Sequence, residues 1–192
     1  MKLVFATNNQ NKINEIQGLI PDSITVLSLE DIGCLEDIPE TQSTIKGNAS
    51  QKATYVKDNY GYNCFADDTG LEVESLNNEP GVFSARYAGE KRDANDNMKL
   101  LLKNLENQSN RNAQFKTVIA LQIEDKSNTF EGICKGEITT KKQGKKGFGY
   151  DPIFKPNNYN KTFAEMDLDL KNKIGHRGKA VLLLVNYLNN II

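Results

Sequence analysis

The stretch LVFATNNQNKINEIQGLI, residues 3–20, joins a buried strand to an amphipathic helix through a polar loop. Leu3–Ala6 is a short apolar run, and Thr7–Asn11 is wholly polar. The apolar residues of the next segment recur at helical spacing, at Ile13, Ile16, Leu19 and Ile20, and Pro21 then ends the predicted helix. A strand that passes directly into a helix favours an α/β fold.

The rest of the chain continues the alternation of helices and strands. We predict helices over Thr44–Lys57, over Met98–Leu105 with Asp93 as the N-cap of that helix, and over Ala180–Ile191. The predicted strands are Cys64–Ala66, Leu71–Ser75, Phe115–Ile123 and Thr129–Ile138. The last two form a hairpin, and the first of them is apolar on both faces, as a central strand is. This order predicts an α/β chain with a mixed sheet.

The composition limits the class of protein. With 192 residues, a net charge of −1 and no linker-like segment, residues 1–192 are predicted to form one domain, with room for two lobes. A dedicated nucleic-acid binder usually has a basic excess, which is absent here. No apolar run approaches the roughly 20 residues that cross a bilayer. Because Met1 and Lys2 lead into a strand and not into a signal peptide, we expect a soluble, cytoplasmic protein.

Cysteine and histidine usage limits the kind of metal site. Cys34, Cys64 and Cys134 are far apart and have no CxxC spacing, which excludes a disulfide framework and a zinc ribbon. The single histidine, His176, excludes a multi-histidine site. A metal would therefore be a hard cation held by carboxylates, with Mg²⁺ as the first expectation.

Two adjacent acids, Asp67 and Asp68, follow the apolar run that ends at Ala66. Neighbouring carboxylates repel each other unless a cation or hydrogen-bond donors compensate them. In a strand the two side chains would point to opposite faces, so at most one would enter a given pocket. The alternative is an ordinary Asp/Gly turn over residues 67–70. Glu40 would belong to the same site only if folding brings it near Asp68.

The polar loop Thr7–Lys12 lies where a strand passes into a helix. Free N–H groups at a helix start favour an anion, and Lys12 adds a positive charge, so the loop is a candidate phosphate site. The alternative is a loop that only caps the helix. The spacing fits neither GxGxxG nor GxxxxGK[ST], which excludes the Rossmann and P-loop motifs.

Two later segments could contact a nucleotide base. In Gly147–Pro152, glycines allow close backbone approach and aromatic rings offer faces for a planar base, although an ordinary turn is the alternative. The lysine-rich residues 141–147 before it are expected to form a solvated hairpin. Lys171–Gly178 is expected to be a polar loop whose donors suit an oxygen-bearing ligand.

Taken in order, TNNQNK, PET, FADDTGLEV, GVFSARYAG, GFGYDPIF and GHRGKA resemble the inosine triphosphate pyrophosphatase family, also called non-standard purine NTP or dITP/XTP pyrophosphatases. The resemblance covers essentially the whole chain. It implies an elongated mixed β-sheet with helical lobes flanking a central nucleotide-binding cleft, and a homodimer. It also implies Mg²⁺-dependent hydrolysis of ITP, dITP and XTP to the monophosphate and pyrophosphate, which removes them from the nucleotide pool.

The resemblance also implies roles for single residues, matched by motif. Asp68 would be the catalytic proton acceptor and, with Glu40, would bind the metal. The phosphate-binding residues would be Thr7, Asn8, Asn9, Gln10, Asn11, Lys12 and Lys52. The remaining substrate-binding residues would be Thr69, Phe148, Gly149, Tyr150, Asp151, Lys171, His176 and Arg177. This chain departs from the family's usual residues at three positions: many relatives have serine where it has Thr69 and Gly175, and glycine is frequent where it has Gln42. These departures bear on specificity and leave the reaction type unchanged.

The base contacts would decide which triphosphate is hydrolysed. Hypoxanthine has an acceptor at O6 and a donor at N1, and adenine reverses both. Donors from His176 and Arg177 would be left unpaired by ATP, and sites of that kind can discriminate by ~10⁴–10⁵. Two alternatives stay open: a related Maf-like nucleotide pyrophosphatase with another base preference, and a non-catalytic nucleotide-binding protein.

Overall fold

The computed structural model describes residues 1–191, and these form two compact units. Unit 1 comprises Met1–Asp68, Thr117–Gly132 and the segment that begins at Arg177, and unit 2 comprises Thr69–Lys116 and Ile133–His176. Three long strands, β3 (Cys64–Val73), β5 (Asn112–Ile123) and β6 (Lys126–Ile138), contribute residues to both units. None of the helices described within residues 1–191 is long and apolar enough to cross a membrane.

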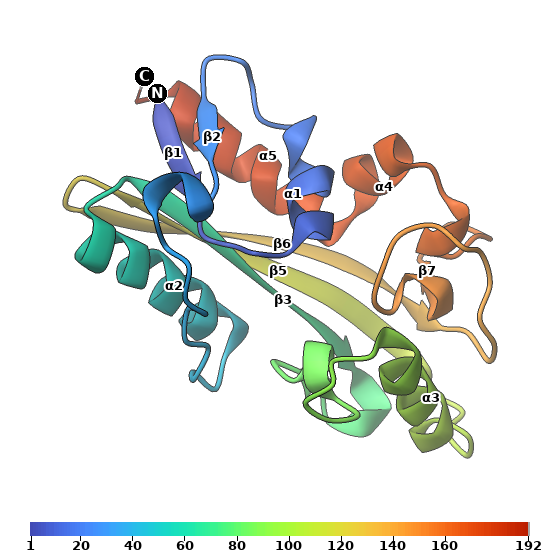
Figure 1. Cartoon of the computed structure of the whole chain (residues 1–192). Coiled ribbons are helices and arrows are strands. Elements are labelled where there is room, and N and C mark those ends of the chain that lie inside the picture. Colours follow the sequence, from blue (N-terminus) through green and yellow to red (C-terminus); the bar gives the residue numbers. More distant parts are fainter. Residues whose placement is uncertain (192) are drawn as a thin grey trace. The chain divides into compact units, whose positions relative to one another are not determined.

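Unit 1 contains the N-terminal strand–loop–helix and the two longest helices. Its strands lie in the order β2-β1-β3-β5-β6, where β1 (Lys2–Phe5) pairs in parallel with both β2 (Thr25–Leu27) and β3. Helix α2 (Ile45–Tyr60) lies on one face of these strands, and α1 (Gln10–Gln17) and α5 (His176–Asn189) lie on the other (Figure 1). A short 3₁₀ helix, Glu30–Ile32, precedes α2.

The core of unit 1 forms between the strands and these helices. Phe5 and Phe65, on neighbouring strands, stack with ring centroids 4.6 Å apart. The buried face of α5 packs against the same apolar cluster with Ala180, Val181, Leu184 and Leu188. On the other side of β3, the Cys64 thiol donates to the carbonyl of Ala53 in α2 at 3.1 Å. Helices on both faces keep the central strands buried, as the apolar pattern of β5 predicts.

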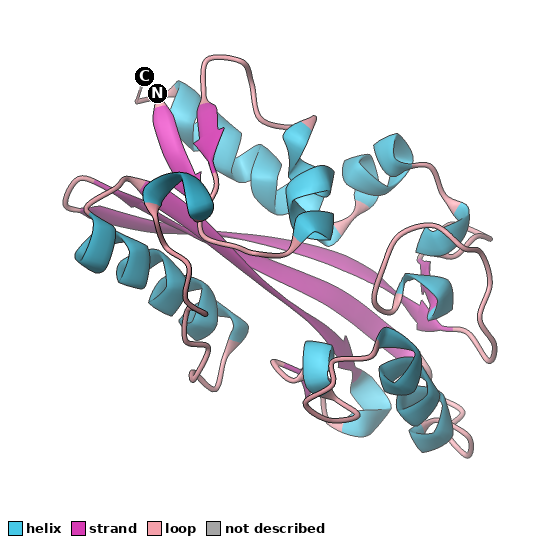
Figure 2. Ribbon diagram, in the orientation of Figure 1, coloured by secondary structure: helices cyan, strands magenta, loops and turns pink. Residues whose placement is uncertain are grey.

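Unit 2 is built around the other ends of the long strands. There β4 (Glu79–Gly81) pairs antiparallel with β3, and β7 (Phe154–Pro156) pairs antiparallel with β6. Short helices and loops, cyan and pink in Figure 2, make up most of the rest. The helices of this unit are α3 (Ala94–Asn104), α4 (Leu168–Ile174) and the 3₁₀ helices Glu74–Leu76, Ser84–Arg86, Asp151–Ile153 and Phe163–Glu165. Its core gathers Leu101, Phe115, Phe154 and Phe163 among other apolar residues.

The predicted α/β class with a mixed sheet is confirmed, since parallel and antiparallel pairs occur in one seven-stranded sheet. The hairpin of β5 and β6 is confirmed as well, because two neighbouring strands joined by two residues must run antiparallel. The predicted cap Asp93 accepts a backbone N–H at the start of α3, and Thr44, the first residue of another predicted helix, accepts one at the start of α2. Helix α1 is shorter than predicted and ends at Gln17.

One local alternative is excluded and two local predictions are wrong. Residues 67–70 are not a turn, because β3 runs unbroken from Cys64 to Val73, with both aspartates paired to side chains on either side of it. Residues 171–178 are not a loop: Lys171 lies in α4, and α5 begins at His176. The lysine-rich segment 141–147 is exposed as predicted, but it forms an irregular loop and not a hairpin, because Lys145 and Lys146 donate their N–H groups to the carbonyl of Ala164.

Candidate functional site

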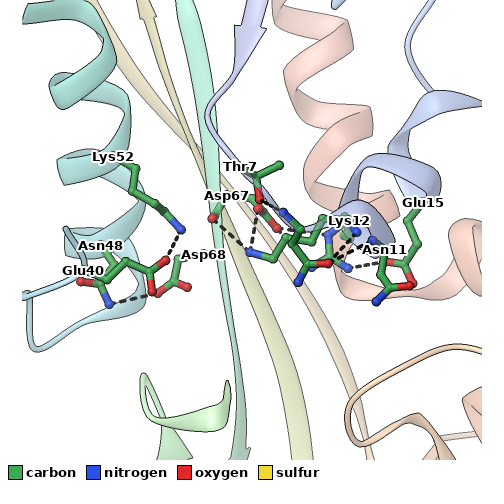
Figure 3. A network of polar contacts seen from close by, with 11 residues as sticks. Thr7, Asn11, Lys12, Glu15, Glu40, Asn48, Lys52, Asp67 and Asp68 are labelled. Atoms are coloured by element: carbon green, nitrogen blue, oxygen red, sulfur yellow. Dashed lines mark hydrogen bonds and ion pairs between the residues drawn. The ribbon is translucent and has the colours of Figure 1, made fainter. Parts of the chain in front are cut away.

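Asp67 and Asp68 lie side by side in β3 and point to opposite faces of the strand, as the strand alternative predicts (Figure 3). Asp67 faces α1, and Asp68 faces α2. Both side chains are buried, with 1% of Asp67 and 8% of Asp68 exposed. Unit 1 therefore holds two neighbouring acidic groups that face different helices.

The Asp67 carboxylate is held by two cations. Lys12 Nζ donates to Asp67 Oδ1 at 2.8 Å, and Arg177 donates to Asp67 Oδ2 from Nε and Nη2, each at 3.1 Å. Burial alone would raise the pKa of Asp67, but the charges of Lys12 and Arg177 outweigh it and hold that pKa well below the ordinary value. Arg177 also donates to Glu15 from Nη1. Two cations and two carboxylates thus form one buried, charge-balanced cluster.

The Asp68 carboxylate has a different environment. Asn48 Nδ2 donates to Asp68 Oδ2 at 3.3 Å, and the Lys52 ammonium donates to Glu40 Oε1 at 2.5 Å. Burial raises the pKa of Asp68, and the nearby carboxylates of Glu40 and Asp67 raise it further. The charges of Lys52 and Lys12 act in the opposite direction but do not outweigh the rise. Burial would lower the pKa of Lys52, but the charges of Asp68 and Glu40 raise it. Folding therefore brings Glu40 into the charge environment of Asp68, which the sequence left as a condition.

Glu40 and Asp68 offer the oxygen donors that a hard divalent cation prefers. Within residues 1–191, no cluster of three or more His, Cys, Asp and Glu side chains is arranged to hold a metal by itself. Mg²⁺ is commonly bound through one or two carboxylates together with water and substrate phosphates. A pair of carboxylates is therefore chemically suited to such an ion when a phosphorylated ligand supplies further oxygens.

The polar loop before α1 is organised around Asn9 and Lys12. Asn9 caps the helix, since its Oδ1 accepts from the N–H groups of Asn11 and Lys12 at 3.0 and 3.3 Å. Thr7 Oγ1 in turn accepts from the N–H of Asn9 at 3.2 Å. Burial lowers the pKa of Lys12, against the opposite pull of Asp67. The loop thus caps α1 through Asn9, and it also places a cation beside β3. The remaining loop residues of the prediction, Asn8, Gln10 and Asn11, are exposed.

Unit 2 contains a second group of the predicted residues. The buried Asp151 carboxylate accepts from Lys171 Nζ at 2.5 Å and from the N–H of Phe148 at 2.8 Å. Lys171 Nζ also lies 5.1 Å from the centroid of the Phe148 ring. Gly147 has φ +71°, and a Cβ there would collide with the Asp151 carboxylate, so this position requires glycine. The Asp151 carboxylate therefore packs against the backbone at both Gly147 and Phe148.

Four further predicted residues of unit 2 have distinct settings. The Tyr150 hydroxyl donates to the carbonyl of Ser84 at 2.9 Å, and burial raises the pKa of this phenol, which keeps it protonated. His176 is buried and stacks on Phe115 with ring centroids 4.5 Å apart. Thr69 is partly buried in β3, and Gly149 has φ +60°.

Sequence reasoning missed Glu15 and Asn48, and it assigned no role to Asp67. Asn48 lies four residues before Lys52, so both lie on one face of α2, and that spacing could have pointed to it. Glu15 meets Arg177 across 162 residues of sequence, a distance over which no local pattern carries a signal.

Comparisons with known proteins agree with one another. The model of the Ham1 family matches residues 3–187. The dITP/XTP pyrophosphatase of Flavobacterium johnsoniae is 67% identical over 188 residues, 98% of each chain, and that of Flavobacterium psychrophilum is 62% identical over 99% of this chain and 100% of its own. The solved structure of the Staphylococcus aureus Ham1 protein superposes with a TM-score of 0.92 at 39% identity, covering 100% of both chains.

Proposed function

Because the chain belongs to the Ham1 family, we propose that it is a nucleoside triphosphate pyrophosphatase that hydrolyses dITP, XTP and ITP to the monophosphate and pyrophosphate. This is the activity class named for its relatives, and the resemblance read from the sequence motifs agrees with it. Since the substrates are nucleotides of the cellular pool, we place its action in the cytoplasm.

The observation that supports the proposal is that the two faces of β3 hold different sets of charged groups. On one face, Asp68 shares the charge of Lys52 with Glu40, and on the other face Asp67 holds Lys12. Asp68 thus belongs to an acidic pair that suits a cation, and its neighbour in β3, Asp67, holds a lysine that suits phosphate. Hydrolysis of a phosphoanhydride needs these two elements, because positioning and electrostatic stabilisation dominate phosphoryl transfer.

The charges of this region favour the arrival of a metal with the nucleotide. The described side chains of the two clusters include three cations and four carboxylates: Lys12, Lys52, Arg177, Glu15, Glu40, Asp67 and Asp68. Their formal balance is therefore one negative charge, which repels a triphosphate. A bound Mg²⁺ at Glu40 and Asp68 would reverse that sign and would neutralise charge on the phosphates.

Asp68 is the group we assign to the attacking water. Burial and its carboxylate neighbours raise its pKa, so it accepts a proton more readily than an exposed aspartate does. The water oxygen forms a bond to the α-phosphorus, its proton passes to Asp68, and the bond between the α-phosphorus and the bridging oxygen breaks. Pyrophosphate leaves with the electron pair of that bond. Lys12, Lys52 and the loop Thr7–Asn11 are assigned to the phosphates.

The base is assigned to the residues of unit 2 and to Arg177. Phe148 offers an aromatic face, and the pair of Asp151 and Lys171 fixes its backbone. Glu15 and Asp67 orient the Arg177 guanidinium before any ligand binds, which suits a group that must read one oxygen of a base. Thr69, Gly149, Tyr150 and His176 complete the proposed substrate contacts.

The decisive measurement is pyrophosphate release from dITP, XTP, ITP, GTP and ATP, with and without Mg²⁺. We expect fast, Mg²⁺-dependent release from the first three nucleotides and little from ATP. Release of inorganic phosphate without pyrophosphate would contradict the proposed bond, and nucleotide binding without any release would indicate a non-catalytic binding protein. A preference for other bases would favour the Maf-like alternative.

We also propose a homodimer, which the resemblance implies. Sedimentation at micromolar concentration tests it directly. A single species of 21.5 kDa, the mass of one chain, would contradict the dimer.

A further inference from the structure

Three side chains of α2 hold three consecutive residues of the segment that carries Glu40. Lys52 Nζ donates to Glu40 Oε1 at 2.5 Å. Gln51 binds Thr41 twice, since its Oε1 accepts from the Thr41 N–H and its Nε2 donates to Thr41 Oγ1, each at 2.9 Å. Asn48 Oδ1 accepts from the Gln42 N–H at 2.9 Å. The segment Glu40–Gln42 lies outside helices and strands, so these bonds supply much of its order.

Helical geometry explains why these three side chains act together. Positions 48, 51 and 52 are separated by three and four residues, which places them on one face of a helix. The backbone also comes close at the start of α2, where a Cβ on Gly47 would lie 2.7 Å from Gln42 Cβ. Glycine at this position therefore lets the Glu40 segment pack directly on the helix.

Asn48 also has a hydrogen bond to the strand that carries Asp68. Its Nδ2 donates to Asp68 Oδ2 at 3.3 Å while its Oδ1 accepts from Gln42. The residue is 1% exposed, and an amide can satisfy both contacts at once because it is donor and acceptor. One buried side chain thus connects the strand that carries Asp68 with the segment that carries Glu40. Figure 3 shows the contact between Asn48 and Asp68.

We propose that Asn48, supported by Gln51, is a positioning residue that presents the carboxylates of Glu40 and Asp68 together to a divalent cation. The inference rests on the proposed function, because it takes these two acids as the metal ligands. Two carboxylates repel each other, and a segment without regular structure would let Glu40 move away. Fixing the segment during folding removes the free-energy cost of ordering it when the ion binds. Outer partners of this kind typically contribute about 10- to 100-fold to metal affinity.

The test is a titration of the full chain with Mn²⁺ alone, in which the EPR signal of the free ion measures how much Mn²⁺ stays unbound. Mn²⁺ accepts the same oxygen ligands as Mg²⁺ and needs no nucleotide to be detected. We expect Asn48→Ala to weaken Mn²⁺ binding about tenfold, and Gln51→Ala to weaken it in the same direction by less. Lys46→Ala, which changes an exposed residue on the same helix, should leave the affinity unchanged.

A second readout separates positioning from general loss of structure. In steady-state assays the Mg²⁺ concentration for half-maximal rate should rise in Asn48→Ala, and saturating Mg²⁺ should restore most of kcat. A purely structural role would lower the unfolding midpoint and leave the Mn²⁺ affinity of the folded fraction intact, which overturns the proposal. If Asn48→Ala does not fold, Gln51→Ala decides, and an affinity equal to wild type there also overturns it.

The two proposals fail in distinguishable ways. A wild-type chain that binds no Mn²⁺ would overturn the proposed metal site and the role of Asn48 with it. A wild-type chain that binds Mn²⁺ while both variants bind it equally well would overturn only the positioning role.

Discussion

Asp67 Oδ2 lies 3.1 Å from Arg177 Nη2, so an ion pair joins the middle of β3 to the first turn of α5. The two residues are 110 positions apart in the sequence and are both almost fully buried. Lys12 binds the same carboxylate from a third element of unit 1. Removing the charge of Asp67 would therefore leave two buried cations with less compensation.

The first prediction is that Asp67→Asn destabilises the protein. Breaking a buried ion pair by removing one partner costs about 3–5 kcal/mol, since the remaining charge stays buried and uncompensated. Urea denaturation at pH 7 measures the change in the free energy of unfolding. The matched control is Asp58→Asn, the same chemical change at an exposed position on α2, which should stay within about 0.5 kcal/mol.

The pH dependence of that difference follows from the lowered pKa of Asp67. A carboxylate whose pKa is lower in the folded state stabilises the fold above the unfolded-state pKa, near 3.8, and loses this contribution as the pH falls below it. The difference in unfolding free energy between wild type and Asp67→Asn should be full at pH 7 and should narrow below about pH 4. A difference that grows on acidification would contradict the assigned ion pairs.

The same substitution at the next residue should have the opposite effect on stability. In Asp68→Asn we expect turnover to be abolished while the free energy of unfolding at neutral pH stays equal or rises. The raised pKa of Asp68 means that the folded state disfavours its ionised form, so removing the charge relieves that penalty. The Asn48 amide can still donate to the new side-chain oxygen. Near-wild-type hydrolysis would remove Asp68 from the mechanism, and a large loss of stability would contradict the burial argument.

These two aspartates also show how much of the site could be predicted from the sequence. The apolar run into adjacent acids predicted a buried strand with side chains on opposite faces, and the structure has this arrangement. The sequence left a turn open, because Asp and Gly favour turns when only local chemistry is considered. The hydrogen-bond partners of the two aspartates, Lys12 and Asn48, lie 55 and 20 residues away in the sequence.

For the segment from Lys171 to Gly178, the prediction from the sequence was wrong. Its charges and glycines predicted a polar loop, and charged residues are rarely buried without partners. In the fold Arg177 has two such partners and His176 stacks on Phe115, so the end of this polar stretch becomes the buried start of α5. Long-range ion pairs override local propensity there, and a single sequence does not show them.

The next prediction concerns the binding of the phosphates by Lys12. Lys12→Met keeps the length of the side chain and removes its charge, and we expect KM for dITP to rise with a smaller change in kcat. A hydrogen bond to a charged group contributes about 1.5–3 kcal/mol, which corresponds to an increase of about 10- to 100-fold. Steady-state kinetics measures both constants, with Lys46→Ala as an exposed lysine control. Unchanged KM and kcat would show that Lys12 serves only to neutralise Asp67.

The last prediction separates stacking on the base from reading of its polar edge. If Phe148 stacks on the purine, Phe148→Ala should cost ~1–3 kcal/mol for every base, because every base has a π-face. The ratio of kcat/KM between ITP and ATP should then stay constant. Arg177→Lys keeps the positive charge that Glu15 and Asp67 require but loses the planar fork. A directed bond to O6 is favourable for ITP and unfavourable for the amino group of ATP, so in this variant the ratio should collapse. Equal losses on ITP and ATP in both variants would mean that Arg177 serves the buried charge cluster alone, and that base selection lies with other residues.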